Sequence, residues 1–544
     1  MEQGGQKNAK MAPWRHPAPV ARKVTQLFYG WRNPHLVFCL AALGAVPFIL
    51  AAAFAPALLS FSSTIEMISP IASARALMNG GAAVQSVSEP FYLFLLSGAD
   101  FFADTPGRIH LLAKMFGAIL VALPLAWFLS VRLPVAQAVI VTAGVAGFVA
   151  APLAGTADLA LSIFMVIALC CIAAPADKSV KRSQGEGAIC GVMLFFLWML
   201  SPLFSLVGFI ALSACPFLGG RNGVRRYAFT MAGFMLLAGG AEIAAPGLNI
   251  ARSEAATTML ADFDLLKNAF GSASFTGVAA STAAVLFLAI VFGGSEYAKG
   301  WGAASGFLLI ALAAAALSGA DPWPLFIVAA CIACYSTESP FYDGVFRQHD
   351  RASIAVAGSA AALTSFWALA LAAQIGVEFV LQDRIARAAP AHIRTELALV
   401  QPEGPTIAQW LEEGRFSTSE ARTLFALAPV DQSEVLLSAI AEARALTRDG
   451  HEVAILTEAD VACVFVAKTT CFVDGQTAAG AANVVLAPRL DLDPATALAK
   501  GRAEGLLYSE FKLVNQSALW EMWVRRDTPS YRLFMQGKTS ANGL

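Results

Sequence analysis

The chain has 544 residues, of which 57% are hydrophobic and 14% are charged, and its formal net charge is −1. Soluble domains carry about 25% charged residues, so this composition excludes an ordinary soluble domain and indicates a protein that crosses a membrane several times. A net charge close to zero provides no overall field that would attract a nucleic acid, and we expect no nucleic-acid partner.

The chain begins with a basic head and continues with apolar segments. Residues 1–35 hold six Lys and Arg side chains against a single acid. Basic flanks stay on the cytoplasmic side of a membrane, so we predict a cytoplasmic N-terminus. A bilayer core needs about 20 apolar residues per helix. Segments of this kind predict an all-α polytopic membrane region over 36–374 with eleven spans: 36–60, 106–130, 134–153, 157–175, 187–200, 202–218, 227–246, 277–293, 302–318, 322–340 and 353–374.

The loops between these spans differ in charge. Basic residues gather in loops 176–186, 219–226 and 341–352, whereas acids gather in loops 61–105 and 247–276. Because basic loops stay in the cytoplasm, this pattern agrees with an odd number of spans and places the C-terminus outside. We therefore predict a multi-pass protein of a bacterial inner (plasma) membrane with a periplasmic C-terminal domain.

The first outer loop, 61–105, interrupts the apolar sequence with signals for helix starts and ends. Proline at the first helical position is favourable, because that position needs no backbone N–H. Asn79 and the two glycines after it are typical of a helix end. We predict two short helices in the loop, followed by the second span. The three starts follow polar residues at Ser69-Pro70, Glu89-Pro90 and Thr105-Pro106.

The composition changes from 375 to 544, where charged residues are frequent and no further long apolar run occurs. Helical periodicity is present in 405–413, 417–427 and 432–448. Short apolar runs after these segments are typical of strands. The pattern predicts an extracytoplasmic α/β domain. The predicted strands are 451–457, 461–467, 470–474, 483–488, 505–511 and 520–526.

Two cysteines lie in this predicted outer domain. Cys463 and Cys471 flank a short apolar run and could meet across a hairpin. An oxidising compartment permits a disulfide between them. Two buried thiols are the alternative, and the sequence leaves both open.

Motifs of soluble enzymes are absent from the sequence. It contains no GxxxxGK[ST], GxSxG or HExxH, and its six histidines are dispersed, so an ATP-driven or zinc-dependent reaction has no support. What remains are carboxylates at the predicted outer membrane face. Glu66 lies just past the first span, and Asp158 begins the fourth. One acid can act as a general base, and a second can orient an acceptor or hold a divalent metal ion.

Basic side chains complete this candidate site. Arg75, Arg108 and Lys114 are candidates for phosphate contacts, because guanidinium and ammonium groups are the usual partners of anions. Lys114 lies deep in a predicted membrane helix, which is costly unless the lysine pairs or reaches the interface. Glu89 lies in the same loop and is grouped with these candidate substrate-binding residues.

Each candidate also has a structural alternative. Glu66 can be a solvated loop acid, and Asp158 can cap its helix, where a negative charge favours the positive end of the helix dipole. Arg75 can lie on a helix surface beside lipid headgroups. Glu89 and Asp104 can be acids that only start helices.

At these positions the chain resembles the GT-C superfamily of polyprenyl-phosphate-sugar glycosyltransferases, in the branch with protein mannosyltransferases and lipid A aminoarabinose transferases. Members of that family have a first outer loop with an acidic pair, a short helix that ends in a glycine, a proline-aromatic stretch and an arginine near the start of the next span. The fourth span of the family often begins with an aspartate. The corresponding stretches here are Ile65-Glu66, IASARALMNG, EPFYLFLL, DTPGRIHLLAKMFGAIL and TADLALSIFMVIAL.

The resemblance implies an enzyme that moves a sugar from a polyprenyl-phosphate donor to a lipid, glycan or protein acceptor outside the cytoplasm. Glu66 would be the general base and Asp158 would assist it, with Arg75, Arg108, Lys114 and Glu89 near the lipid phosphate. Membrane lipid would surround the site. No cofactor is implied with certainty, and a divalent metal ion stays an open option.

Three departures from the family pattern support a different interpretation. Ile65 replaces the first acid of the pair, Glu89 stands where a basic residue often precedes the proline, and LSPLFSL lacks a lysine that the family often has there. These changes favour a catalytically inactive relative, a scaffold or assembly subunit that binds lipid or a membrane protein partner. A transporter is less favoured, because the spans hold few charges and no inverted repeat is visible.

Overall fold

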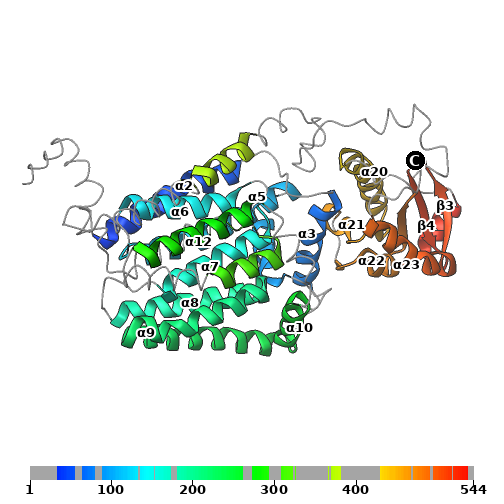
Figure 1. Ribbon diagram of the computed structural model, residues 1–544. Coiled ribbons are helices and arrows are strands. Elements are labelled where there is room, and N and C mark those ends of the chain that lie inside the picture. Colours follow the sequence, from blue (N-terminus) through cyan, green and yellow to red (C-terminus); the bar gives the residue numbers. More distant parts are fainter. Residues whose placement is uncertain are drawn as a thin grey trace, which may run out of the picture.

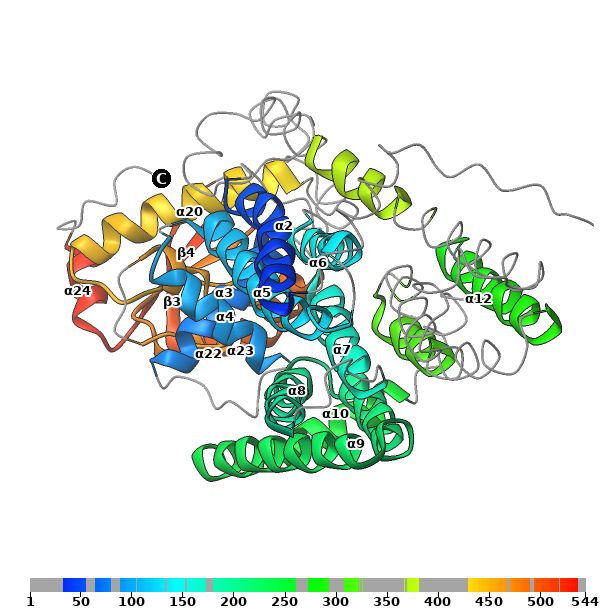
Figure 2. The same cartoon turned by 90° about the vertical axis from the view of Figure 1, so that its left-hand side faces the viewer.

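The described part of the chain is mostly helical and consists of a helical bundle with a small sheet domain at one end (Figure 1). Figure 2 shows the same two parts after a turn of 90°, with α2, α5, α6 and α7 side by side. The computed structural model describes residues 33–54, 64–79, 89–103, 105–132, 135–151, 154–172, 180–260, 273–292, 308–320, 322, 325, 366, 369–380, 429–466, 470–489, 494–517 and 519–536.

The bundle contains several helices that could span a membrane, as expected for a membrane protein. Four stretches of the described chain are long and apolar enough: Pro34–Ala51, Pro106–Leu129, Val180–Leu200 and Arg221–Ala244. The labelled bundle helices are α2 (Pro34–Phe54), α5 (Pro106–Leu129), α6 (Val135–Ala150), α7 (Thr156–Ile172), α8 (Val180–Leu200), α9 (Pro202–Ala244) and α12 (Ala273–Phe292).

The predicted spans coincide with helices where the chain is described. Helices α2, α5, α6, α7, α8 and α12 each overlap one predicted span, and the helix Leu308–Ser318 falls within another. The predicted spans 322–340 and 353–374 lie almost wholly outside the described residues. The helix Leu369–Val380 continues past the domain boundary predicted at 374.

Helix α9 folds back on itself. The rings of Phe209 and Phe234 lie 4.9 Å apart in an edge-to-face contact, whereas a straight helix would separate residues so distant in sequence by about 37 Å. The turn lies between them, because a Cβ atom on Gly223 would stand only 2.0 Å from the carbonyl oxygen of Cys215. The two halves of α9 therefore run side by side, as the predicted spans 202–218 and 227–246 require.

Helices α8 and α9 approach each other closely at two glycines. A Cβ atom on Gly187 would meet the Arg226 carbonyl oxygen at 2.6 Å, and one on Gly191 would meet the Thr230 carbonyl oxygen at 2.6 Å. The two glycines are four residues apart and lie on one face of α8. Small residues at this spacing let membrane helices pack backbone against backbone.

One buried carboxylate joins the helices at the end of the bundle away from the sheet domain. Glu186 on α8 accepts hydrogen bonds of 3.0 and 2.9 Å from Arg132, which follows the C-terminal end of α5. Arg182 and Arg226 lie 3.4 and 4.0 Å from the same carboxylate. The Glu186 and Arg132 side chains are fully buried. We call these four residues the inner network.

The first outer loop contains two helices, and the first begins earlier than predicted. Helix α3 (Thr64–Met78) includes Pro70 in its interior, so the prediction that the helix starts at this proline is wrong. An internal proline removes one backbone hydrogen bond and bends a helix, which persists when its two halves are held by neighbouring elements. Helix α4 (Pro90–Asp100) begins as predicted, with Glu89 as its N-cap.

The C-terminal domain is built on a mixed sheet with the strand order β1-β2-β4-β3. Strand β1 (Val453–Ile455) runs parallel to β2 (Val484–Pro488). Strand β4 (Trp520–Arg525) pairs antiparallel with β2 and with β3 (Phe511–Gln516). The predicted α/β character of this domain is thereby confirmed for the described residues.

Helices cover both faces of this sheet. Val453 and Ile455 lie in an apolar cluster with residues of α20 (Pro429–Arg448), whereas Ala454 lies in a second cluster with residues of α22 (Gly475–Ala481) and α23 (Pro494–Glu510). This alternation follows from the strand itself, in which successive side chains point to opposite faces.

The predicted strands of this domain are only partly correct. Segments 451–457, 483–488 and 520–526 contain β1, β2 and β4, but 461–467 contains helix α21 (Val461–Phe465) and 505–511 is mostly the end of α23. Residues 470–474 form no strand. Short apolar runs do not distinguish a buried helical turn from a strand. The predicted helix 432–448 is confirmed by α20, and 405–413 and 417–427 lie outside the described residues.

Helix α3 contributes to the core of the C-terminal domain although it belongs to the first loop. Met67 and Ile68 are fully buried in the apolar cluster that also holds Val435 of α20 and Val461 of α21. Figure 1 shows α3 between the bundle and α21. The C-terminal domain is therefore joined to the end of the bundle at which α4 and α5 begin, which we call the outer end.

Candidate active site at the outer end of the bundle

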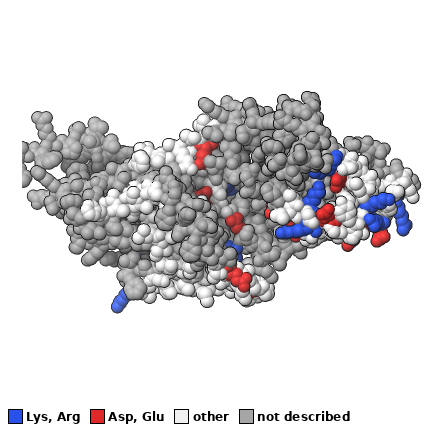
Figure 3. Space-filling model, turned by 45° about the vertical axis from the view of Figure 1, so that its right-hand side comes forward, with Lys and Arg blue, Asp and Glu red and all other residues white. Residues whose placement is uncertain are grey.

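Ionisable side chains from four separate helices gather at the outer end. Figure 3 shows that the described surface of the bundle in this view is mostly uncharged, whereas charged atoms gather toward the C-terminal domain and on it. The four side chains are Glu89 before α4, Lys114 on α5, Asp158 on α7 and Arg252 on α10 (Leu248–Leu260). We call them the outer cluster.

Glu89 links the start of α4 to the start of α7. Its Oε1 accepts a hydrogen bond of 2.7 Å from the hydroxyl of Thr156, the first residue of α7. Burial raises the pKa of the Glu89 carboxyl above its usual value, while the Thr156 hydroxyl and the positive charge of Arg252 partly offset this increase. A buried carboxyl with a raised pKa is a candidate for proton transfer.

Arg252 brings a positive charge to the same place from α10. Its Nε donates to the carbonyl oxygen of Trp198 at 3.1 Å, and the Trp198 indole N–H donates to Asn249 at 3.1 Å. Burial lowers the pKa of the Arg252 guanidinium to about 10, and the negative charge of Glu89 acts in the opposite direction. Arg252 is therefore a cation held in a buried position beside Glu89.

Lys114 lies on the other side of the outer cluster. It is buried on α5, and its ammonium group donates to the carbonyl oxygen of Ala151 at 3.3 Å. It also interacts electrostatically with Asp158 and with Glu378, which lies on the helix Leu369–Val380. Pairing with acids is one of the two ways in which a lysine within an apolar helix can be accommodated.

Asp158 has a structural role in addition to its interaction with Lys114. Its Oδ2 accepts a hydrogen bond of 2.8 Å from the backbone N–H of Gly155, which precedes α7. This is the geometry of a residue that caps the start of its own helix. The first turn of α7 thus carries both Asp158 and the hydroxyl group that contacts Glu89.

A buried histidine connects this site to α3. His110 Nε2 lies 2.7 Å from the Met67 carbonyl oxygen, and its Nδ1 lies 2.9 Å from the Tyr92 hydroxyl. A carbonyl oxygen can only accept, so Nε2 carries the proton and Nδ1 accepts a hydrogen bond from Tyr92. The contact fixes the first half of α3 against α5 and α4.

This contact also locates the residue that the sequence analysis proposes as the general base. Glu66 directly precedes Met67 in α3, so its backbone lies beside the outer end of α5. The side chain of Glu66 lies outside the described part of the structure. Its proposed role stays a prediction.

Two of the predicted phosphate-binding residues, Arg108 and Arg75, are not among the four residues of the outer cluster. Arg108 is exposed on the first turn of α5. Arg75 forms an ion pair of 2.7 Å with Asp100 and donates hydrogen bonds to two carbonyl oxygens of the C-terminal domain. Arg75 therefore connects α3, α4 and the C-terminal domain. This is a structural role, whereas the sequence indicated a phosphate contact or a position on a helix surface.

Three residues of this region were not predicted from the sequence as site residues: Arg252, Thr156 and Glu378. Glu378 carries a signal that could have found it, because an acid within an apolar helix is costly unless it has a function or a partner. Arg252 and Thr156 carry no such signal, since basic and hydroxyl residues are common at helix ends. Only the fold brings them to the outer cluster.

The described residues include no group of three or more His, Cys, Asp and Glu side chains with the geometry of a metal site. Comparison with known proteins gives no match: no protein-family model, curated protein or solved structure matches the chain. The chemistry of the outer cluster is therefore the basis on which a function is proposed.

Proposed function

We propose that this protein is a membrane glycosyltransferase of the GT-C type in a bacterial inner membrane, with about eleven spans and a periplasmic C-terminal domain. It would transfer a sugar from a polyprenyl-phosphate carrier to a hydroxyl group of a lipid, glycan or protein acceptor. The observation that supports this most is the convergence of acids and bases from α4, α5, α7 and α10 at one end of an apolar bundle. Such a site can hold a charged headgroup while the carrier tail stays among apolar helices.

In this proposal the acids and bases have separate tasks. A carboxylate takes the proton of the acceptor hydroxyl, whose oxygen attacks C1 of the sugar while the bond from C1 to the phosphate oxygen breaks. The electron pair of that bond leaves with the polyprenyl phosphate. Arg252 and Lys114 are suited to stabilise the negative charge that grows on this phosphate.

Two glutamates are candidates for the base. Glu66 is the residue that the resemblance indicates, and its backbone lies beside α5. Glu89 is the candidate that the geometry adds, because its carboxyl is buried, has a raised pKa and lies beside a cation. Asp158 would assist by holding Lys114 and the first turn of α7 in place.

The test is transfer of a labelled sugar from polyprenyl-phosphate donors in proteoliposomes. Glu66→Gln and Glu89→Gln are compared with wild type and with Glu254→Gln, which changes an exposed acid on α10 outside the outer cluster. Loss of a general base lowers the rate by about 10²–10⁴-fold. We expect this loss in one of the two variants and wild-type transfer in Glu254→Gln. Equal activity in all four proteins would remove both glutamates from the mechanism.

A scaffold or assembly subunit is the second candidate function. It is favoured by the fact that Arg75 and Asp158, both predicted site residues, make structural contacts within the chain. Absence of transfer from every donor by folded wild-type protein would support this function. Copurification of a stable membrane partner would then identify what the scaffold holds.

A further inference from the structure

The contact between α3 and the C-terminal domain is centred on a disulfide bond. Cys463 on α21 and Cys471 form this bond, with Cα atoms 5.4 Å apart. Both cysteines are almost completely buried, and Ala76 of α3 packs against them in one small cluster. The Asn79 side-chain amide lies 3.4 Å from the Cys471 sulfur. The end of α3 therefore covers the disulfide.

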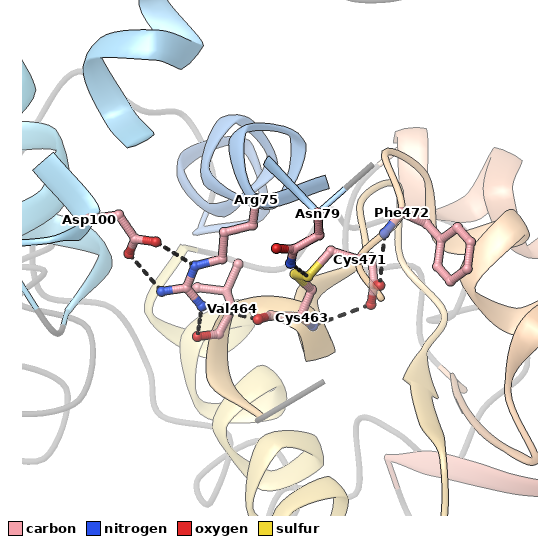
Figure 4. The surroundings of a disulfide bond; sticks show 8 residues. Arg75, Asn79, Asp100, Cys463, Val464, Cys471 and Phe472 are labelled. Atoms are coloured by element: carbon pink, nitrogen blue, oxygen red, sulfur yellow. Dashed lines mark hydrogen bonds and ion pairs between the residues drawn. A yellow bond between two sulfur atoms is a disulfide. The ribbon is translucent and has the colours of Figure 1, made fainter. Parts of the chain in front are cut away.

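Arg75 holds α3 in this position. Its guanidinium pairs with both carboxylate oxygens of Asp100, at 2.8 and 2.7 Å, and donates to the carbonyl oxygens of Cys463 at 3.0 Å and Val464 at 2.7 Å. Figure 4 shows Arg75 between Asp100 on one side and the disulfide segment on the other. One side chain of α3 is thus bonded to α4 and to the C-terminal domain at once.

The disulfide segment is itself fixed from within the C-terminal domain. The fully buried Asp460 accepts hydrogen bonds of 3.3 Å from the backbone N–H of Cys463 and from that of Phe472, next to Cys471. Its carboxylate therefore holds both arms of the segment. With the disulfide closed, the two carbonyl groups that Arg75 contacts are kept in a single arrangement.

We propose that Arg75 and Ala76 on α3, Asn79 directly after it, and the Cys463–Cys471 segment form a redox-sensitive latch. In the oxidised protein the latch holds α3 on the C-terminal domain. Reduction of the disulfide loosens α21 and releases the end of α3. In turn, docked α3 shields the disulfide from reductants, so that docking and oxidation stabilise each other.

The reduction step is ordinary thiol–disulfide exchange with a dithiol of the extracytoplasmic compartment. A thiolate of the dithiol attacks one cysteine sulfur, the bond between Cys463 and Cys471 breaks, and a mixed disulfide forms. The second thiol of the reductant then displaces the protein sulfur. The products are two cysteine thiols in the protein and one oxidised dithiol. Because both sulfurs are buried, attack requires α3 to move away first.

The latch also links the disulfide to the candidate active site, and this link rests on the proposed function. Helix α3 carries Glu66 and presents the Met67 carbonyl to His110 beside the outer cluster. Release of the C-terminal end of α3 would weaken the positioning of the first half of α3, which holds Glu66 and Met67. Arg75 would then be a positioning residue for the proposed base, and transfer would depend on the redox state of a bond in another domain.

The first test measures how fast the disulfide is reduced in the full-length protein in nanodiscs. Free thiols are blocked with N-ethylmaleimide, dithiothreitol is added, and the newly formed Cys463 and Cys471 thiols are alkylated with a second reagent and quantified by mass spectrometry. Arg75→Ala removes four hydrogen bonds of a charged group, two of them to the disulfide segment, and we expect reduction to become at least about tenfold faster.

The matched control is Arg525→Ala in the same domain. The Arg525 side chain is 26% exposed and pairs with Glu510, whereas the Arg75 side chain is 27% exposed and pairs with Asp100. Arg525 does not contact the disulfide segment in the described structure, so the latch predicts a wild-type reduction rate. Equal rates in wild type, Arg75→Ala and Arg525→Ala would overturn the proposal. Acceleration in both variants would mean general loosening of the domain and would also overturn it.

A second measurement covers the case that Arg75→Ala fails to fold. Hydrogen exchange of α3 is followed in wild type before and after reduction, and the paired variant Cys463→Ser, Cys471→Ser is compared with both. The latch predicts faster exchange at residues 74–79 after reduction and in the paired variant. Unchanged exchange in both would refute it. Neither measurement uses sugar transfer, so a failed transfer assay would count against the proposed function alone.

Discussion

The two ends of the helical bundle use charged residues in different ways. At the end away from the C-terminal domain one carboxylate, Glu186, contacts three guanidinium groups, and this inner network is buried. At the outer end acids and bases of several elements lie near one another, and they also bind neutral groups. Glu89 accepts from a hydroxyl, Asp158 from a backbone N–H, and Lys114 donates to a carbonyl oxygen.

This difference separates charges that hold helices together from charges that can act on a ligand. In a low-dielectric interior, direct ion pairs with good geometry are locked, and breaking one leaves an uncompensated charge. In the outer cluster, by contrast, acids and bases are held at helix starts by a hydroxyl and a backbone N–H, and burial raises the pKa of the Glu89 carboxyl. We therefore interpret the inner network as a structural lock, and we propose the outer cluster as the ligand site.

Removing the central charge of the inner network gives the largest expected effect. Glu186→Gln leaves Arg132 and Arg226 buried without their common anion, and we expect a loss of about 3–5 kcal/mol in stability. The melting temperature of the purified protein in detergent measures this loss. Glu89→Gln at the outer end is the comparison, and it should melt within a few degrees of wild type. A Glu186→Gln protein as stable as wild type would contradict the structural role of the inner network.

The close approach of α8 and α9 gives the next largest effect. Gly191→Ala places a methyl group against the Thr230 carbonyl, a backbone atom that cannot move away alone, and we expect destabilisation by about 1–3 kcal/mol. Gly239→Ala is the matched control, because a Cβ atom there meets nothing within 4 Å. Thermal unfolding of both variants tests the contrast, and equal melting temperatures would show that the two helices are less tightly packed than described.

A smaller effect concerns the pH dependence of the outer cluster. Arg252 lowers the pKa of Glu89, which burial has raised, so Arg252→Gln removes that offset and raises the pKa further. If transfer requires ionised Glu89, the acidic limb of the pH–rate profile moves to higher pH in Arg252→Gln. The profile of transfer between about pH 5 and 9 measures the shift. A limb that stays in place, or moves to lower pH, would exclude Glu89 as the ionising group.

The smallest expected effect is a pH dependence of stability that comes from the C-terminal domain, away from the bundle. His451 is buried, its Nδ1 lies 2.8 Å from the Ser530 hydroxyl, and burial lowers its pKa. The unfolded chain therefore binds a proton more readily, and stability should fall as the pH drops below about 6.5. Melting temperatures between pH 5 and 8 test this, with His451→Gln as the variant in which the slope should decrease. An unchanged slope would assign the pH dependence to other groups.

Local signals in the sequence predicted much of the fold. Glu89 before Pro90 and Thr105 before Pro106 mark the starts of α4 and α5, because a proline at the first position leaves few alternatives. The same reasoning is wrong for Pro70, where tertiary contacts keep a helix intact around an internal proline. Run length and apolarity also failed to separate α21 from a strand. The structure shows Asp460 as the N-cap of α21, where its side chain accepts a hydrogen bond from the backbone N–H of Cys463.

The candidate site was predictable only in part. Lys114 stood out because a charge within a membrane helix is costly, and Asp158 because it begins a span at the predicted outer face. The structure shows an electrostatic interaction between the two. Arg75 belongs to a contact between elements nearly 390 positions apart, for which a single sequence contains no signal. Arg252 reaches Glu89 because α9 folds back and returns the chain to the outer end, and this too depends on the fold.

The most direct test of the outer cluster as a ligand site is photo-crosslinking with a polyprenyl-phosphate analogue that carries a diazirine beside its phosphate. The cross-linked protein is digested and the labelled residues are identified by mass spectrometry, with unlabelled polyprenyl-phosphate sugar as competitor. Our account predicts competable labels near 89–92, 110–114, 154–158 and 249–252. Labels concentrated at the inner network, or labels at the outer end that the competitor does not reduce, would contradict it.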